Sequence, residues 1–107
     1  MSHQVLLVAE AEEDILDIYK YVLRADGRSR ADYVLRKLQE TCQRLSRMPR
    51  RGHSPPELER IGVCGFREVH FEPYRIIYQI AARKVFIHCV LDGRRSMQEI
   101  LERRLLR

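Results

Sequence analysis

Arginines occur at two unusual places in residues 73–95, a strand centre and a strand exit. This segment, PYRIIYQIAARKVFIHCVLDGRR, has the apolar and aromatic content of two strands joined by a tight turn. Arg75 falls within the first strand, and Arg94 and Arg95 directly follow the second. Because a guanidinium is a planar fork that binds phosphate or carboxylate at two points, the pattern predicts a negatively charged partner.

Other interpretations of these positions remain open. Arg75 and Arg95 could instead pair within the chain, with a carboxylate from the set Glu68, Glu72 and Asp92, which contributes little at a surface. Asp92 suits a turn, and His88, like His70, suits packing or contact with a partner better than catalysis.

Composition places the chain among globular proteins with one domain, residues 1–107. The net charge is +5, and it is unevenly distributed: residues 1–26 carry two basic and six acidic groups, whereas the rest is basic. All basic residues but three are arginine. The three cysteines show no metal-ligand spacing, so we expect reduced thiols and no metal. With no signal peptide and no apolar run of membrane-spanning length, we expect a cytoplasmic protein without a membrane partner.

Apolar periodicity predicts an α+β fold of order β-α-α-β-β-β-α, a helical hairpin packed on a mainly antiparallel four-stranded sheet. The N-terminal strand, 3–9, has the apolar run of a strand at the sheet centre or buried on both faces. The hairpin links its helices by three to five residues, with Ser29 as the N-cap of the second. Ser96 and Glu99 resemble a capping box for the last helix. The predicted elements are strand 3–9, helices 10–26 and 29–47, a loop with a single turn at 57–60, strands 66–71, 74–80 and 84–91, and a helix from 96.

Alternation along the central strand assigns its side chains to two faces. One face carries Tyr74, Ile76, Tyr78 and Ile80, which should meet the helices. The other carries Arg75, and we expect it to be open to a partner, as one face of an antiparallel sheet can be. The strand at 66–71 leaves its register undecided, because Arg67 shares parity with the apolar Val69 and Phe71.

Motifs of common enzymes are absent from the sequence. It contains no Gly-x-Gly-x-x-Gly segment, no P-loop, no His-Glu-x-x-His and no nucleophile elbow. We therefore expect no cofactor, and we lean toward a binding protein.

The order of elements, together with EAEEDILDIYKYV, FREV, PYRIIYQI and VLDGRRSMQEILERRLL, resembles the RelE/ParE superfamily of bacterial type II toxins over nearly the whole chain. The resemblance implies a small basic toxin that inhibits growth and is neutralised by an antitoxin protein. It implies contact with operator DNA only through the antitoxin complex. Two targets divide the superfamily: RelE-like members cut messenger RNA on the ribosome, and ParE-like members poison DNA gyrase.

The residues favour the gyrase poison. Arg75 and Arg95 match arginine positions of RelE-like nucleases, but the expected tyrosine falls near Leu101, and the expected lysines fall near Phe66 and Glu68. A nuclease would use Arg67, Arg75 and Arg95 on phosphate, with His70 or His88 moving protons. A nontoxic nucleic-acid-binding module is the third hypothesis. The candidate contacts for target or antitoxin are Arg75, His88, Arg94, Arg95, Arg103 and Arg104.

Overall fold

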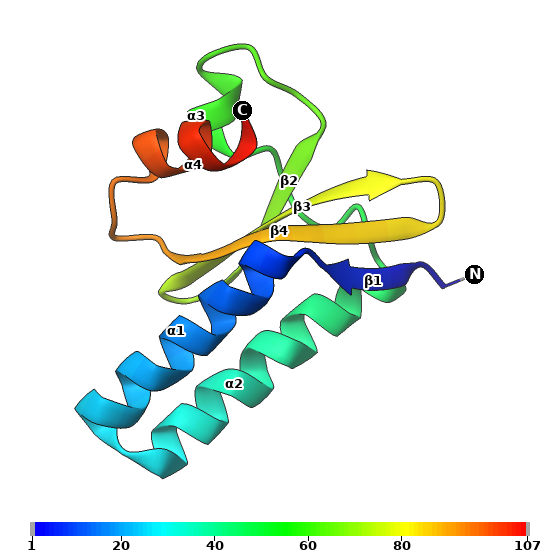
Figure 1. The fold of residues 1–107 in the computed structure, drawn as a ribbon. Coiled ribbons are helices and arrows are strands. Elements are labelled where there is room, and N and C mark those ends of the chain that lie inside the picture. The colour runs from blue at the N-terminus through cyan, green and yellow to red at the C-terminus, as the bar shows by residue number, and fades with distance from the viewer. Residues whose placement is uncertain (1, 107) are drawn as a thin grey trace.

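A computed structural model describes residues 2–106 and contains the predicted elements in the predicted order (Figure 1). A 3-10 turn, η1, forms the end of the predicted second helix, and a short helix, α3, lies where a single turn was predicted at 57–60. The elements are β1 (Gln4–Leu7), α1 (Ala9–Asp26), α2 (Arg28–Gln43), η1 (Arg44–Ser46), α3 (Pro56–Glu59), β2 (Phe66–Phe71), β3 (Tyr74–Ala81), β4 (Lys84–Asp92) and α4 (Met97–Leu105).

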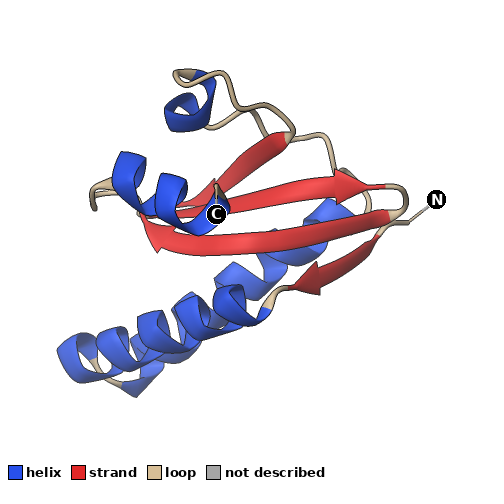
Figure 2. Ribbon diagram, turned by 45° about the horizontal axis from the view of Figure 1, so that its top comes forward, coloured by secondary structure: helices blue, strands red, loops and turns tan. Residues whose placement is uncertain are grey.

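The elements form three layers. The sheet has the order β1-β4-β3-β2, with β1 parallel to β4 and the other pairs antiparallel. Helices α1 and α2 cover one face, and α3 and α4 lie on the opposite face (Figures 1 and 2). The prediction of a central or doubly buried first strand is wrong, because β1 lies at the sheet edge and none of its residues is fully buried.

The helical hairpin is tighter than its sequence suggested. A single residue, Gly27, separates the helices, and its φ of +90° lies in the region that favours glycine. Ser29 therefore lies inside α2 and is not its N-cap, which corrects the predicted boundary and the predicted linker. Ser96 does occupy the N-cap of α4, but its side chain makes no capping hydrogen bond, so the expected capping box does not form.

The main core lies between the hairpin and the sheet. Ala11, Ala31 and Leu38 of the helices are fully buried there, as are Ile76 and Tyr78 of β3. The predicted inward face of β3 is confirmed, because alternate side chains of this strand reach the same core. Strand β2 also resolves its register: Val69 pairs with Ile76, so Val69 and Phe71 face the hairpin.

The second face of the sheet is covered, so the expected open face is wrong. A second core joins Leu58 of α3 and Leu101 of α4 to Ile77 and Cys89 of the sheet, and all four are fully buried. The sequence predicted α4 and a turn at the position of α3, but a pattern of apolar residues does not specify which face of the sheet these short elements cover. Burying apolar side chains on both faces makes the sheet the middle of the domain.

A β-bulge in β4 places His88. The antiparallel register between β3 and β4 shifts after Ile77, which pairs with Cys89, whereas Tyr78 pairs with Ile87. His88 is the extra residue. Its Nε2 lies 2.9 Å from Oε1 of Gln79, and its ring packs edge-on against Phe66 at 5.7 Å. His88 therefore packs on the face of the sheet that α4 covers, in agreement with the interpretation of His88 as a packed residue.

Two cysteines are buried and one is exposed, and all three are free thiols. Burial raises the pKa of Cys42 to about 12, and burial is also the main reason that the pKa of Cys89 rises to about 12. These two thiols therefore stay protonated and act as small apolar groups. Across residues 2–106, no helix is long and apolar enough to cross a membrane.

The loop before α3 is fastened to the sheet at Gly52. The hydroxyl of Tyr78 donates to the carbonyl of Pro49 at 2.6 Å and accepts the Gly52 N–H at 3.2 Å. A Cβ on Gly52 would lie 2.4 Å from the carbonyl oxygen of Glu68 and 2.7 Å from the Tyr78 hydroxyl. This close approach leaves no room for a side chain.

Gly52→Ala should therefore destabilise the fold by about 1–3 kcal/mol, because backbone atoms of β2 would have to move. The measurement is denaturant unfolding followed by circular dichroism. Ser54→Ala, a change at an exposed neighbour, serves as the control. Equal stability of Gly52→Ala and the control would show that the loop is not held at this point.

Candidate functional site

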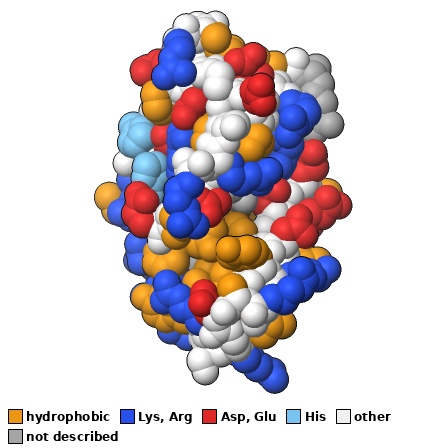
Figure 3. Space-filling model, turned by 90° about the vertical axis from the view of Figure 1, so that its left-hand side faces the viewer, with side chains coloured by type: hydrophobic (Ala, Val, Ile, Leu, Met, Phe, Trp, Pro, Cys, Tyr) orange, Lys and Arg blue, Asp and Glu red, His pale blue; other side chains and the backbone are white. Residues whose placement is uncertain are grey.

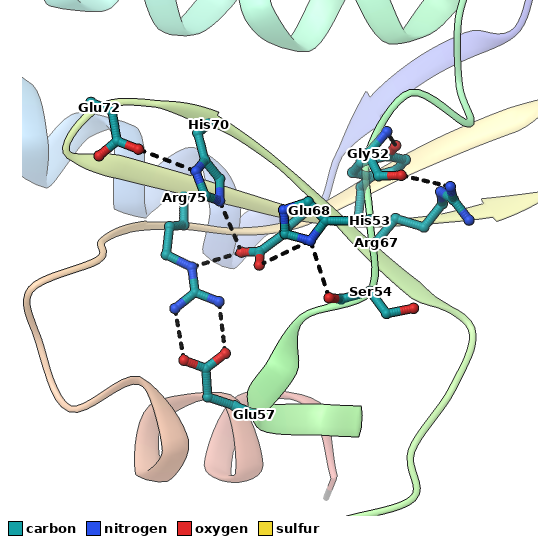
Figure 4. Close-up of polar contacts among 10 residues, drawn as sticks. Gly52, His53, Ser54, Glu57, Arg67, Glu68, His70, Glu72 and Arg75 are labelled. Atoms are coloured by element: carbon teal, nitrogen blue, oxygen red, sulfur yellow. Dashed lines mark hydrogen bonds and ion pairs between the residues drawn. The ribbon is translucent and has the colours of Figure 1, made fainter. Parts of the chain in front are cut away.

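Arg75 sits at the centre of an ion-pair network that joins β3, β2 and α3 (Figure 4). Its Nε donates to Oε1 of Glu68 at 2.6 Å, and its two terminal nitrogens donate to the Glu57 carboxylate at 2.7 and 2.8 Å. The Arg75 side chain is 13% exposed. Three directed bonds to two carboxylates use the fork that a phosphate would need.

Burial makes this network electrostatically important. Glu68 is only 1% exposed, and a buried carboxylate is costly unless a cation and hydrogen bonds compensate it. Hydrogen bonds from Arg75 hold the pKa of Glu57 below its ordinary value, and Glu57 is the main reason that the pKa of Arg75 is raised. The intramolecular alternative for Arg75 is the one found. Its second partner, Glu57, was not predicted, because the sequence around an acidic residue in a proline-rich loop does not indicate which basic residue it will contact.

Arg104 is also engaged within the chain. Its terminal nitrogens donate to both oxygens of Asp14 at 3.1 and 2.9 Å, and one donates to the His88 carbonyl at 2.9 Å. The side chain is 14% exposed. Since Asp14 itself accepts the Val90 N–H at 3.0 Å, this pair ties α4 to α1 and β4.

Arg94, Arg95 and Arg103 are the predicted contact arginines that are exposed. Arg94 folds back onto Asp92 with bonds of 2.9 and 2.6 Å, and this contact is the main cause of the lowered pKa of Asp92. The Arg95 side chain forms no hydrogen bond or ion pair within residues 2–106. The same holds for the Arg103 side chain, so Arg95 and Arg103 are the predicted arginines most available to a partner.

The three arginines of the nuclease hypothesis do not share one face. Arg67 pairs with Tyr78 in the sheet register, so it lies on the side opposite Arg75. Its Nη2 donates to the carbonyls of Arg50 and Gly52 at 2.8 and 2.6 Å, which fixes the loop before α3. His70 pairs with Arg75 in the register of the sheet and lies on β2 beside Glu68.

A groove lies between α1 and the end of β4, and we call it the Tyr21 groove. It has a volume of about 370 Å³, and Tyr21 is 67% exposed at its rim. Figure 3 shows hydrophobic surface bordered by basic and acidic side chains on this side of the molecule. The remaining lining residues are Asp14, Asp17, Ile18, Tyr74, Val90, Leu91, Asp92 and Arg95. Its apolar floor and charged rim suit a peptide that carries both kinds of side chain.

The sequence matches a protein family over residues 5–97, and that family is described as the ParE toxin of the type II toxin–antitoxin system, parDE. The chain belongs to the ParE toxin family. The matched range runs from β1 to the start of α4, so it includes the hairpin, the Tyr21 groove and the Arg75 network. The predicted superfamily is confirmed.

Solved structures share the fold of this ParE-family toxin. One is described as the chromosomal ParDE system of P. aeruginosa, with a TM-score of 0.70 and 18% identity over 83% of this chain and 94% of that chain. Another is the RelBE2 toxin–antitoxin complex of Mycobacterium tuberculosis, with a TM-score of 0.61 and 22% identity over 86% of this chain and 92% of that chain. No match was found among curated proteins.

Arg75→Ala should destabilise this ParE-family toxin by about 3–5 kcal/mol, because it leaves Glu68 charged, buried and without its guanidinium. Chemical denaturation at pH 7 measures the loss. Arg94→Ala removes a guanidinium from a surface pair, so it should leave the unfolding midpoint unchanged. If the two variants were equally stable, the Arg75 network would not be structural.

Acid should weaken the same network. The folded-state pKa of Glu57 is below its ordinary 4.5, so the stability it contributes is complete above pH 4.5 and is lost as pH falls through the folded pKa. Glu57→Gln should lower the free energy of unfolding at pH 7 and flatten its decline below pH 4.5. Urea unfolding at several pH values measures both effects. Parallel curves for wild type and variant below pH 4.5 would contradict the assignment.

Proposed function

We propose that this ParE-family toxin arrests bacterial growth by poisoning DNA gyrase, and that a cognate antitoxin neutralises it by occupying the Tyr21 groove. The proposal goes beyond family membership in its target and in its site. The observation that carries it is that Arg75 is ion-paired with Glu57 and Glu68, so its guanidinium is not free to bind a phosphate.

A ribosome-dependent nuclease needs cations free to neutralise the scissile phosphate. Here Arg75 is bound to Glu57 and Glu68, and Arg67 faces the other side of the sheet. This arrangement supports a toxin that acts by binding. It also removes Arg75 and Arg104 from the contacts we propose, since their side chains are only 13% and 14% exposed and hold carboxylate partners within the chain, whereas Arg94 is exposed.

The contacts we propose for gyrase are the exposed arginines around the start and the end of α4, namely Arg94, Arg95 and Arg103. Arg94 and Arg95 lie on the turn that leads into α4 and next to the Tyr21 groove. An antitoxin segment in that groove would cover the Arg95 side of the turn. Neutralisation would then follow from direct competition for the same surface.

The antitoxin segment should place an apolar side chain against Ile18 and Tyr74 and an acidic group near Arg95. These choices follow from the groove lining, in which Arg95 makes no hydrogen bond or ion pair among the described residues, whereas Asp14 and Asp92 are already paired with Arg104 and Arg94. Charge complementarity of this kind accelerates association and fixes orientation. The acidic antitoxin is thus the negatively charged partner that the sequence predicts.

The first test is to mix the purified toxin with gyrase, ATP and supercoiled plasmid. We expect protein-linked cleaved DNA and loss of supercoiling activity, with both effects reversed by the antitoxin. Arg94→Ala combined with Arg95→Ala should abolish them. Arg24→Ala with Arg28→Ala removes the same charge at the tip of the hairpin and should leave the toxin active.

Two outcomes would overturn the gyrase assignment. One is normal gyrase activity with a toxin that still binds its antitoxin. The other is growth arrest accompanied by new codon-phased ends in messenger RNA, which would identify a nuclease. Poisoning by the Arg94 and Arg95 double variant would keep the target and reject the contact surface.

Tyr21→Ser should weaken antitoxin binding at least tenfold, because it removes an aromatic side chain from the proposed interface. Isothermal calorimetry with the antitoxin measures this change. Leu16→Ser is the matched control, since Leu16 is 51% exposed on the same helix but does not line the groove. Equal losses in both variants would place the antitoxin elsewhere on α1.

A further inference from the structure

Two histidines and a buried glutamate converge at the outer edge of β2. An isolated antiparallel bridge between His53 and Glu68 brings the loop before α3 against the strand, with backbone hydrogen bonds of 3.1 and 2.7 Å. His70 lies two residues along β2 and points to the same side as Glu68 (Figure 4). Neither the proposed gyrase contacts nor the Tyr21 groove uses these three residues.

Their spacing fits a small metal ion. Nδ1 of His53 is 3.6 Å from Oε2 of Glu68, and Nε2 of His70 is 3.4 Å from Oε1 of Glu68. One ligand atom from each residue lies within 4.8 Å of the others. A tetrahedral zinc ion with bonds of about 2.0–2.2 Å needs its ligand atoms roughly 3.3–3.5 Å apart, so the exposed imidazoles would have to rotate toward each other. Nδ1 of His53 would exchange its 3.2 Å contact with the Ser54 carbonyl oxygen for the metal and release its proton.

Two of the proposed ligands, Glu68 and His70, also have a hydrogen-bonding partner that fixes their orientation, as ligands of metal sites usually do. Glu68 is held by the 2.6 Å bond from Arg75, which in turn is fixed by Glu57. The other ring nitrogen of His70, Nδ1, lies 3.2 Å from Oε1 of Glu72. A carboxylate behind a histidine ligand fixes the ring and its tautomer, and mutation of such a group usually weakens metal affinity.

The open side of the cluster faces a pocket of about 260 Å³, which is lined partly by Arg44, Arg51 and Thr41. An ion held by three protein ligands would therefore have a fourth position directed toward solvent. Positive charge from Arg44 and Arg51 opposes a cation. The carboxylates of Glu57, Glu68 and Glu72 balance the three guanidinium groups of Arg44, Arg51 and Arg75, so the surroundings of the site are close to neutral before an ion binds.

We propose that His53, Glu68 and His70 form a binding site for one divalent zinc-class ion, with the fourth coordination position open to the Arg44 and Arg51 pocket. Two imidazoles and one carboxylate favour zinc over magnesium or calcium, which prefer oxygen ligands. Metal binding fastens the loop of His53 to β2, and so stabilises the support of α3.

This site was not predicted from the sequence. His53 and His70 are far apart along the chain, and the spacing of histidines and cysteines predicted no metal. The bridge between the loop and β2 creates the proximity, and loop conformation is not encoded by periodicity.

The test uses tag-free protein in a Cys64→Ser background, because Cys64 is an exposed free thiol that could bind zinc. After treatment with a chelator, the protein is titrated with Zn²⁺ by calorimetry and with Co²⁺ by visible absorption. We expect one ion per chain and an increase in Tm with added zinc. His53→Gln with His70→Gln should weaken binding about 100-fold or more, and Glu72→Gln should weaken it roughly 10-fold.

His3→Gln with His88→Gln is the matched control, since it removes the other two histidines of the chain and should leave affinity unchanged. His53→Gln alone changes a side chain that is 63% exposed, so it tests the site even if the double variant fails to fold. Equal affinity in parent and His53→Gln would overturn the proposal. So would the absence of zinc binding in the parent, which would leave the histidines as neighbours of Glu68 only.

Discussion

The bond between Arg75 and Glu68 is the interaction on which the second layer of the domain depends. Glu68 is a carboxylate with 1% exposure in the middle of β2, and it needs a cation that cannot move away. Arg75 supplies that charge, and its two terminal nitrogens donate to Glu57 of α3. The same guanidinium therefore compensates a buried charge and positions the helix that carries Leu58 into the second core.

The architecture could be predicted where side-chain periodicity carries the information. The inward face of β3 is confirmed because Tyr74, Ile76 and Tyr78 alternate with residues of the other face. The prediction of an exposed second face was wrong because Leu58 of α3 and three residues of α4, Met97, Ile100 and Leu101, cover it. An apolar stripe on a short helix does not specify where that helix packs. Register of β2 could not be predicted from parity, and the structure fixes it through the pairing of Val69 with Ile76.

The sequence indicated which arginines of the candidate site to consider, but not which residues they contact. Arg75 and Arg104 were predicted as contacts for a partner, whereas the structure pairs them with Glu57 and Asp14, which lie 18 and 90 residues away along the chain. No local pattern specifies such a partner. Arg95 kept its predicted exposure because it follows Gly93 in a turn, where the side chain has no neighbouring element to cover it. The groove beside it arises from the crossing of α1 and β4, which only the assembled fold defines.

Asp14 belongs both to the lining of the Tyr21 groove and to the pair that holds α4 through Arg104. If a ligand binds only when Asp14 is paired with Arg104, its affinity is thermodynamically linked to the packing of α4 against α1. Occupation of the groove would shift α4 toward its docked position by mass action, and loosening of α4 would weaken the ligand to the same degree. The C-terminal helix is in this sense a reporter of whether the groove is filled.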